Sequence, residues 1–186
     1  MPKGYFKQKI LLHQLKAKDK EAFAEFYDSY VSRIYRFIFF KVSAEQEAQD
    51  LTSEVFLKTW QYLNEGGIIN DLNAWIYRLA RNAVIDWYRK QNKEPLALDE
   101  QAEDTVTTKS DEQVSIDWEV VKIKEDLFKL KDEYREVLVM RFLDELEISE
   151  IAKALEKSKG AVRVLIHRAL NALKEIVNKN VGPTNN

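Results

Sequence analysis

Apolar residues recur at helical spacing through most of the chain, and the alternating pattern of half-buried strands is missing. Only five glycines and three prolines interrupt this pattern. It predicts helices at about 7–16, 20–40, 44–63, 72–90, 116–131, 132–143, 148–155 and 159–177. The expected fold class is therefore all-α.

One segment, from Lys93 to Ser115, differs from the rest because it has no sustained apolar period. Residues 93–120 hold two basic and nine acidic side chains, whereas the blocks on either side are slightly basic. A connection of this length usually separates domains or has a function of its own. We therefore predict two small helical domains on a flexible acidic linker, with domain 1–92, linker 93–115, domain 116–180 and tail 181–186.

Composition limits the functional classes. The chain has no cysteine, so disulfides and thiolate metal sites are excluded. No apolar run is long enough to cross a bilayer, and the N-terminus lacks a signal-peptide pattern, so we expect a cytoplasmic protein without membrane insertion. No catalytic motif is present, and no metal or cofactor is expected.

The helix predicted at 72–90 carries two stripes. The first is apolar and is expected to face a core: Leu72, Ile76, Leu79, Ala83 and Trp87. The second combines a ring, cations and polar groups: Trp75, Arg78, Asn82, Asp86 and Arg89. It is either a solvated face or a nucleic-acid surface, where guanidinium groups contact phosphates and rings stack on unpaired bases.

The segment 148–174 has the pattern of a helix-turn-helix, in which two short helices flank a tight break. Ser158 is expected to cap the second helix. The inward positions are Ile148, Ile151, Ala152, Leu155, Val162, Ile166, Ala169 and Leu173. The opposite face carries Arg163, Val164, His167 and Arg168, which suit a DNA groove. A helical hairpin with a basic exterior is the alternative.

Five segments, in this order, resemble an RNA polymerase sigma factor of the extracytoplasmic-function (ECF) group: "AFAEFYDSYVSRIYRFIFF", "QDLTSEVFLKTW", "AWIYRLARNAVIDWYRK", "EYREVLVMRF" and "GAVRVLIHRALNALK". The resemblance covers about residues 20–92 and 120–177. It implies a region 2 that binds and melts the minus 10 promoter element, and a region 4 that reads the minus 35 element. It also implies core RNA polymerase, promoter DNA and an anti-sigma factor as partners.

The resemblance further implies roles for single residues. The β′ clamp helices of core polymerase would dock on Asp50, Ser53, Glu54 and Lys58, with Leu51, Val55, Phe56 and Leu57 available for burial, and the β flap would bind region 4. The loop 64–71 would capture a flipped base. The minus 10 set would be Asn64, Gly66, Asn70, Trp75, Arg78, Arg81, Asn82 and Arg89. The minus 35 set would be Ser158, Lys159, Arg163, Val164, His167 and Arg168.

Several positions depart from the family pattern. Glu156 stands where the turn commonly has glycine, which would strain the backbone if φ is positive there. Val164 replaces a common serine, Leu165 and Leu170 replace common arginines, and Ser53 replaces a frequent glutamine. The second helix is thus less basic than is typical. A stand-alone helix-turn-helix regulator is the alternative function, although it leaves the docking face and the ring-rich helix unexplained.

Overall fold

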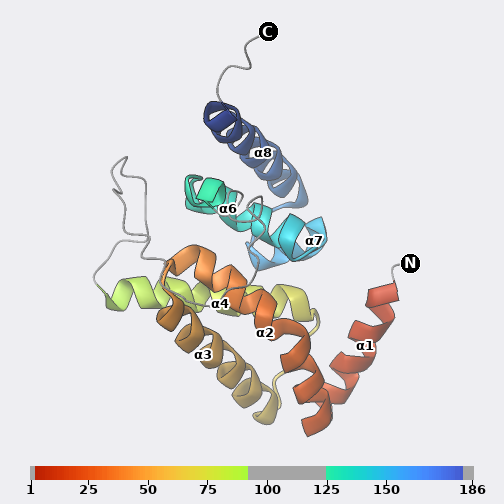
Figure 1. The fold of residues 1–186 in the computed structure, drawn as a ribbon. Coiled ribbons are helices and arrows are strands. Elements are labelled where there is room, and N and C mark those ends of the chain that lie inside the picture. The colour runs from red at the N-terminus through yellow and green to blue at the C-terminus, as the bar shows by residue number, and fades with distance from the viewer. Residues whose placement is uncertain (1–2, 92–124, 182–186) are drawn as a thin grey trace, which may run out of the picture.

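The computed structural model describes residues 3–91 and 125–181, and every regular element in these ranges is a helix. In chain order they are α1 Lys3–Lys16, α2 Lys20–Val42, α3 Glu45–Asn64, α4 Leu72–Lys90, α6 Asp132–Leu138, the π-helix η1 Val139–Leu143, α7 Ile148–Ala154 and α8 Lys159–Val181 (Figure 1). The all-α prediction is confirmed. The expected linker, the start of the helix predicted at 116–131, and residues 182–186 lie outside the described ranges.

Several helix boundaries differ from the prediction: α1 begins at Lys3 instead of about residue 7, and α8 extends to Val181 instead of about residue 177. The described part of the segment 116–131 is helical only at 125–128, and a turn separates it from α6. The single helix expected at 132–143 is an α-helix that continues as a π-helix from Val139. Hydrophobic spacing does not distinguish these hydrogen-bond patterns, because both keep the same residues near the core.

Local capping explains where several helices begin. The Asp19 carboxylate accepts hydrogen bonds from the backbone N–H groups of Glu21 and Ala22, at 2.9 and 3.3 Å. Asp71 caps α4 in the same way, at 3.1 Å from the Ala74 nitrogen. Each cap satisfies N–H groups that have no partner inside the helix.

The N-terminal half is a bundle in which α2, α3 and α4 pack against one another, with α1 beside the start of α2 (Figure 1). Its centre is rich in rings, because Phe26 contacts Tyr30 and Phe56, and Phe37 meets Tyr77 edge to face. In the C-terminal half, α6 and α7 both pack on α8. Each half thus buries its own apolar stripe.

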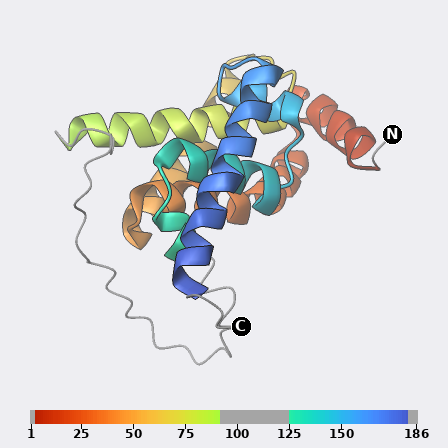
Figure 2. The same ribbon diagram turned by 90° about the horizontal axis from the view of Figure 1, so that it is seen from above.

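The two halves also pack directly against each other. α6 lies against α2 and α7 against α4, so the C-terminal helices cover one side of the N-terminal bundle (Figures 1 and 2). Phe128 contacts Phe39 and Phe40 across this boundary, with ring centroids 6.1 and 5.2 Å apart. The apolar core therefore continues from one half into the other.

Candidate nucleic-acid interface

The apolar stripe of α4 faces the core as predicted. Leu72, Ile76 and Ala83 are buried, while Leu79 and Trp87 are partly buried against the same cluster. The periodicity did not single out Tyr77 and Tyr88, which are also buried. The Tyr88 hydroxyl donates a 2.7 Å hydrogen bond to the Lys41 carbonyl of α2, so its polar end is satisfied inside the protein.

The second stripe of α4 is exposed at Arg78, Asn82, Asp86 and Arg89. Asp86 lies 3.6 Å from the Arg89 guanidinium, which accounts for an acidic side chain within a basic stripe. Trp75 is different, because its side chain is only partly accessible. The stripe therefore offers solvent a polar and cationic surface with one half-covered ring.

Trp75 stacks on Tyr62 at the end of α3, with ring centroids 4.4 Å apart and planes inclined by 27°. The Arg78 guanidinium lies 5.8 Å from the Trp75 ring centroid. The indole N–H is buried without a hydrogen-bond partner among the described residues. Tyr62 was missed by the sequence reasoning, although its position two residues before the loop 64–71 was an available signal.

The loop 64–71 is largely exposed and has one buried side chain. Gly66 has a φ of 86°, a conformation that favours glycine. Gly67 is required for a different reason, because a Cβ there would lie 2.3 Å from the Tyr62 ring. Ile69 is buried and anchors the loop, whereas Asn64 and Asn70 are exposed. The two asparagine side chains are thus accessible in a loop that packs against Tyr62 at Gly67.

The second half of the candidate interface is the helix-turn-helix formed by α7 and α8. Ser158 caps α8 as predicted, since its hydroxyl accepts from the Ala161 N–H at 3.1 Å. The inward positions are buried or partly buried, with Ile151, Val162 and Ala169 fully inaccessible. The outward set is exposed, namely Lys159, Arg163, Val164, His167 and Arg168. We call Arg163, Val164, His167 and Arg168 the recognition face.

Glu156 occupies the turn between α7 and α8 with a φ of 54°. The left-handed conformation costs a non-glycine residue about 1 kcal/mol or more, so the strain expected at this position is present. The Glu156 carboxylate lies 4.0 Å from the Arg78 guanidinium of α4. The strained residue therefore faces the other half of the molecule.

Two arginines of α4 pair with carboxylates of the C-terminal half, although both keep part of their side chains accessible to solvent. The Glu136 carboxylate lies 3.3 Å from both Arg81 Nε and Lys41 Nζ. The side chains of Glu136 and Lys41 are 5% and 7% exposed, so this pairing is largely shielded from water. Of the predicted minus 10 residues, Arg81 and Arg78 are thus engaged by carboxylates of the C-terminal half.

The start of α4 makes two further contacts with α7. Asn73 donates to the Glu150 carboxylate at 2.8 Å and accepts from the Tyr30 hydroxyl at the same distance. Lys153 reaches the Asp71 carboxylate at 2.7 Å. Because Asp71 ends the loop 64–71, these contacts place α7 beside the proposed base-capturing segment.

A second polar cluster surrounds Asp144, whose side chain is fully buried. Arg36 pairs with its carboxylate, and Arg33 donates to its carbonyl. Burial raises the pKa of the Asp144 carboxyl above its ordinary value, against the opposing effect of the hydrogen bond from Arg36 and the nearby charge of Arg33. Burial and the nearby Asp144 charge raise the pKa of the Tyr77 hydroxyl, which therefore stays protonated. The cluster joins α2 and α4 to the segment after η1.

The predicted docking face on α3 is accessible. Asp50 and Ser53 are exposed, and Glu54 forms an ion pair with Lys58. Leu57 was expected to be available for burial, but it is 56% exposed, because it lies on the outer side of α3. Leu51, Val55 and Phe56 are buried as expected.

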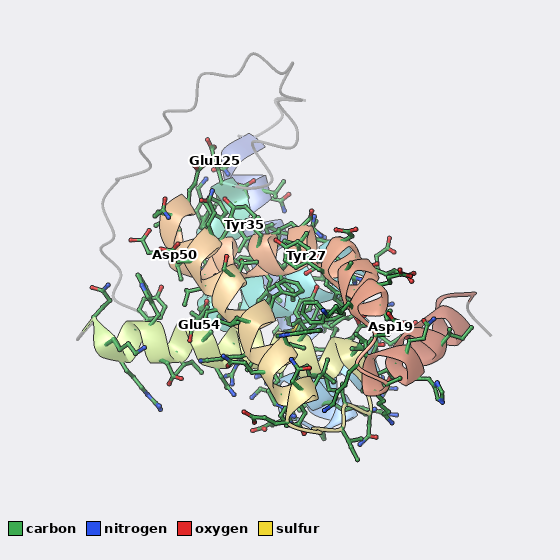
Figure 3. The ribbon with its side chains drawn as sticks, turned by 90° about the horizontal axis from the view of Figure 1, so that it is seen from below. Asp19, Tyr27, Tyr35, Asp50, Glu54 and Glu125 are labelled. Carbon is green, nitrogen blue, oxygen red and sulfur yellow. The ribbon has the colours of Figure 1, made fainter. Side chains whose placement is uncertain are left out.

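A shallow groove of about 300 Å³ runs between α2 and α3 beside this face. Tyr27 and Tyr35 mark it on α2, and Asp50 and Glu54 project from α3 on the same side of the molecule (Figure 3). Its lining consists of Tyr27, Val31, Ser32, Tyr35, Gln49, Thr52 and Ser53. The groove and the adjacent acids form a surface of mixed apolar and acidic character.

Within residues 3–91 and 125–181, no helix is long and apolar enough to cross a membrane. The same ranges contain no group of three or more His, Asp or Glu side chains that is placed to hold a metal ion.

Comparison with known proteins agrees with this organisation. The family model described as Sigma-70 region 2 matches residues 26–94, and that described as Sigma-70, region 4 matches residues 127–173. The chain is 30% identical over 175 residues to "ECF RNA polymerase sigma factor SigW" of Bacillus subtilis, covering 88% of this chain and 93% of that protein.

Two solved structures share the fold. One is CnrH in complex with the cytosolic domain of CnrY, with a TM-score of 0.66, 21% identity and coverage of 90% of this chain and 95% of that one. The other is the sigma factor RpoE of Bartonella quintana in complex with the anti-sigma factor NepR, with a TM-score of 0.65, 19% identity and coverage of 83% and 96%. Taken with the two matched sigma regions and the relative in Bacillus subtilis, the helix-turn-helix and the ring-bearing α4 identify this chain as a member of the ECF RNA polymerase sigma factors.

Proposed function

We propose that the chain divides promoter recognition between two surfaces. It does so as an alternative sigma factor, which directs promoter-specific initiation by core RNA polymerase. The loop 64–71 and the outer stripe of α4 bind the opened minus 10 element. The recognition face of α8 reads the minus 35 element. Residues 1–92 and 116–180 act as the two domains, and the acidic segment 93–115 connects them.

The observation that carries the minus 10 assignment is a loop with exposed Asn64 and Asn70 that packs, through Gly67, against the Tyr62 and Trp75 stack. Amide groups hydrogen-bond base edges, and aromatic rings stack on unpaired bases. The cations Arg78 and Arg89, together with Arg81 and Asn82, lie along the same helix and suit the phosphate backbone. This combination favours single-stranded or melted DNA, since duplex bases offer no free faces. Gly66 supplies the turn that presents the asparagines.

The minus 35 assignment is supported by the open recognition face. Arg163 and Arg168 suit phosphate or guanine, His167 donates or accepts, and Val164 offers an apolar contact. Ser158 and Lys159 lie at the start of α8, where N–H groups and a cation favour a phosphate. None of these contacts requires covalent chemistry from the chain, so we assign it no enzymatic activity.

For core polymerase, we propose that Asp50, Ser53, Glu54 and Lys58 dock on the β′ clamp helices, with the groove between α2 and α3 receiving apolar side chains. The exposed Leu57 extends this surface. The β flap is the proposed partner of the C-terminal domain. An anti-sigma factor is a further proposed partner, by analogy with the relatives that were solved with one. We propose on this basis that the chain acts in the cytoplasm.

Reconstitution with core polymerase on a genomic DNA library, followed by sequencing of transcript starts, tests this proposal. We expect starts to share a minus 10 and a minus 35 motif that vanish when the chain is omitted. If no promoter is transcribed, and the chain alone binds promoter DNA tightly, the results would instead support a stand-alone regulator. A matched control carries Asp50→Lys and Glu54→Lys, which should lose core binding and leave the helical content unchanged.

A further inference from the structure

The C-terminal end of α3 is completed by a side chain from another part of the chain. A helix leaves its last four carbonyl groups without partners inside the helix. In α3, the three carbonyls that precede that of Asn64 accept hydrogen bonds from N–H groups of the following loop, at 2.8–3.1 Å. The carbonyl of Asn64 instead accepts from the Lys18 ammonium group at 2.8 Å. A residue 46 positions earlier in the sequence therefore satisfies the end of this helix.

The Lys18 ammonium group also suits this place electrostatically. A helix carries a partial negative charge at its C-terminus, which a nearby cation stabilises. The last turn of α3 has no basic residue of its own, and Lys18 supplies the cation from the turn between α1 and α2. That turn and the end of α3 lie at the same end of the N-terminal bundle (Figure 1). The contact thus combines a hydrogen bond with a favourable charge.

The backbone of Lys18 has a conformation that favours glycine, with a φ of 60°. It closes α1, because the N–H group of Asp19 donates to the Gln14 carbonyl at 3.3 Å and that of Lys18 to the Leu15 carbonyl at 3.0 Å. Glycine is the usual residue at such a helix end. Glycine here would relieve the strain, but it has no side chain that reaches α3. A strained position of this kind is a reason to ask what its side chain does.

The contact lies where the loop 64–71 leaves α3. Farther along this loop, Gly67 packs against Tyr62 and Ile69 is buried. These supports lie beyond Asn64, whose own side chain is exposed. The direction of the Asn64 side chain therefore depends on the last turn of α3, and that turn is held from outside by Lys18.

We infer that Lys18 is a positioning residue for minus 10 recognition, which holds Asn64 and the start of the loop in the orientation that binds a flipped base. The inference rests on the role proposed above for the loop 64–71. Lys18 acts through the loop and does not itself read a base. Because the loop is ordered before DNA binds, its amide groups keep the hydrogen-bond geometry that suits one base.

Three substitutions of Lys18 separate the side-chain contact from the backbone strain. Lys18→Met keeps the length of the side chain and removes its ammonium group. Lys18→Arg keeps a cationic donor, and Lys18→Gly removes the side chain while suiting the positive φ. The matched control is Lys16→Met at an exposed position in the last turn of α1, which removes the same charge close by.

Two measurements test the inference. Hydrogen exchange of residues 65–70 in the free chain reports whether the loop is held. Competition between promoters that differ at single minus 10 positions reports base discrimination by the holoenzyme. The combined variant Asn64→Ala with Asn70→Ala, called the asparagine variant, marks the positions that the loop reads. Urea denaturation and affinity for core polymerase are measured in parallel.

We expect Lys18→Met to exchange faster in the loop and to lose discrimination by about twofold to fivefold, because one exposed hydrogen bond from a charged group contributes modestly. Lys18→Gly should lose discrimination to the same extent without losing stability, since glycine relieves the strain. A purely structural role would not separate these two quantities. Lys18→Arg and the control Lys16→Met should keep the discrimination of the wild type, and affinity for core polymerase should be unchanged throughout.

Several results would overturn the inference. One is unchanged loop exchange or unchanged discrimination in Lys18→Met, and another is an equal loss of discrimination in Lys16→Met. A further loss when Lys18→Met is added to the asparagine variant would show that Lys18 acts on DNA without the loop. If the asparagine variant itself keeps full discrimination, the proposed role of the loop fails together with the inference. If that variant loses discrimination and Lys18→Met does not, only the inference fails.

Discussion

The outer stripe of α4 and the recognition face of α8 are both proposed to bind DNA, but their charged groups stand in different surroundings. Arg81 and Arg78 face carboxylates of the other half, and Trp75 is covered on one side by Tyr62. The recognition face is exposed at all four positions. The proposed minus 10 surface is therefore partly covered by the C-terminal half, whereas the recognition face is open.

This difference separates two kinds of control over promoter binding. A surface that is already exposed needs only to be brought to the correct distance from its partner surface. A surface whose cations are paired internally must first exchange those pairs for phosphate contacts. We therefore expect substitutions on the recognition face to affect duplex affinity directly, and those around α4 to act also through the internal ion pairs of its arginines.

The largest effect is expected for Arg163→Ala on the recognition face. Loss of one arginine contact to a base should weaken binding of the holoenzyme to promoter DNA by about 1–3 kcal/mol. The measurement is a titration on templates with an intact and with a scrambled minus 35 element. Lys174→Ala, an exposed substitution farther along α8, is the control. An equal loss on both templates would show that Arg163 contributes charge without reading sequence.

A smaller effect is expected when Asn64→Ala and Asn70→Ala are combined in the loop beside α4. Loss of amide contacts to a flipped base should reduce discrimination at the minus 10 element by about 1–2 kcal/mol. Competition between promoters that differ at single minus 10 positions measures this selectivity. Affinity for core polymerase, measured in parallel, should be unchanged. Undiminished promoter selectivity would remove the loop from the minus 10 site.

Val164 provides a finer test of the recognition face. Its side chain is 51% exposed among polar neighbours, and an apolar group in the major groove suits the methyl group of thymine. Replacing the contacted thymine by deoxyuracil should cost about 0.8 kcal/mol, the value of one buried methyl-sized group. Val164→Ser should abolish this sensitivity to the methyl group. If the wild type and Val164→Ser lose the same affinity when each minus 35 thymine is replaced by deoxyuracil, the proposed contact between Val164 and a thymine methyl group is refuted.

Local features of both surfaces were predictable from sequence, because they depend on neighbouring residues. Ser158 caps α8, and Leu72, Ile76 and Ala83 face the core, since capping and helical period act within a few residues. The resemblance to sigma factors also supplied the roles proposed for the loop and the recognition face.

Features that depend on distant residues were not predictable. Periodicity gives no indication that Glu136 meets Arg81, because the two are brought together only when the halves pack. The same holds for Tyr62 under Trp75 and for the exposure of Leu57, which depend on how α3 lies against its neighbours. Periodicity thus identifies which side of a helix is apolar, whereas packing decides which polar groups become partners.

The smallest expected effect concerns the turn that connects the two surfaces. Glu156 has a positive φ, so Glu156→Gly should stabilise the chain by about 0.5–1 kcal/mol, while the exposed ion pair that it removes contributes less. Urea denaturation followed by circular dichroism measures the change. Glu156→Ala is the matched control, because it removes the carboxylate without relieving the strain and should change stability by less than about 0.5 kcal/mol.

The two variants together separate backbone strain from side-chain contacts. If glycine stabilises the chain while the alanine variant does not, the positive φ of Glu156 lowers the stability of the fold by more than the contacts of its side chain raise it. The contact of Glu156 with Arg78 is then too weak to offset the strain of the turn. If glycine gives no gain, the turn accommodates glutamate without strain.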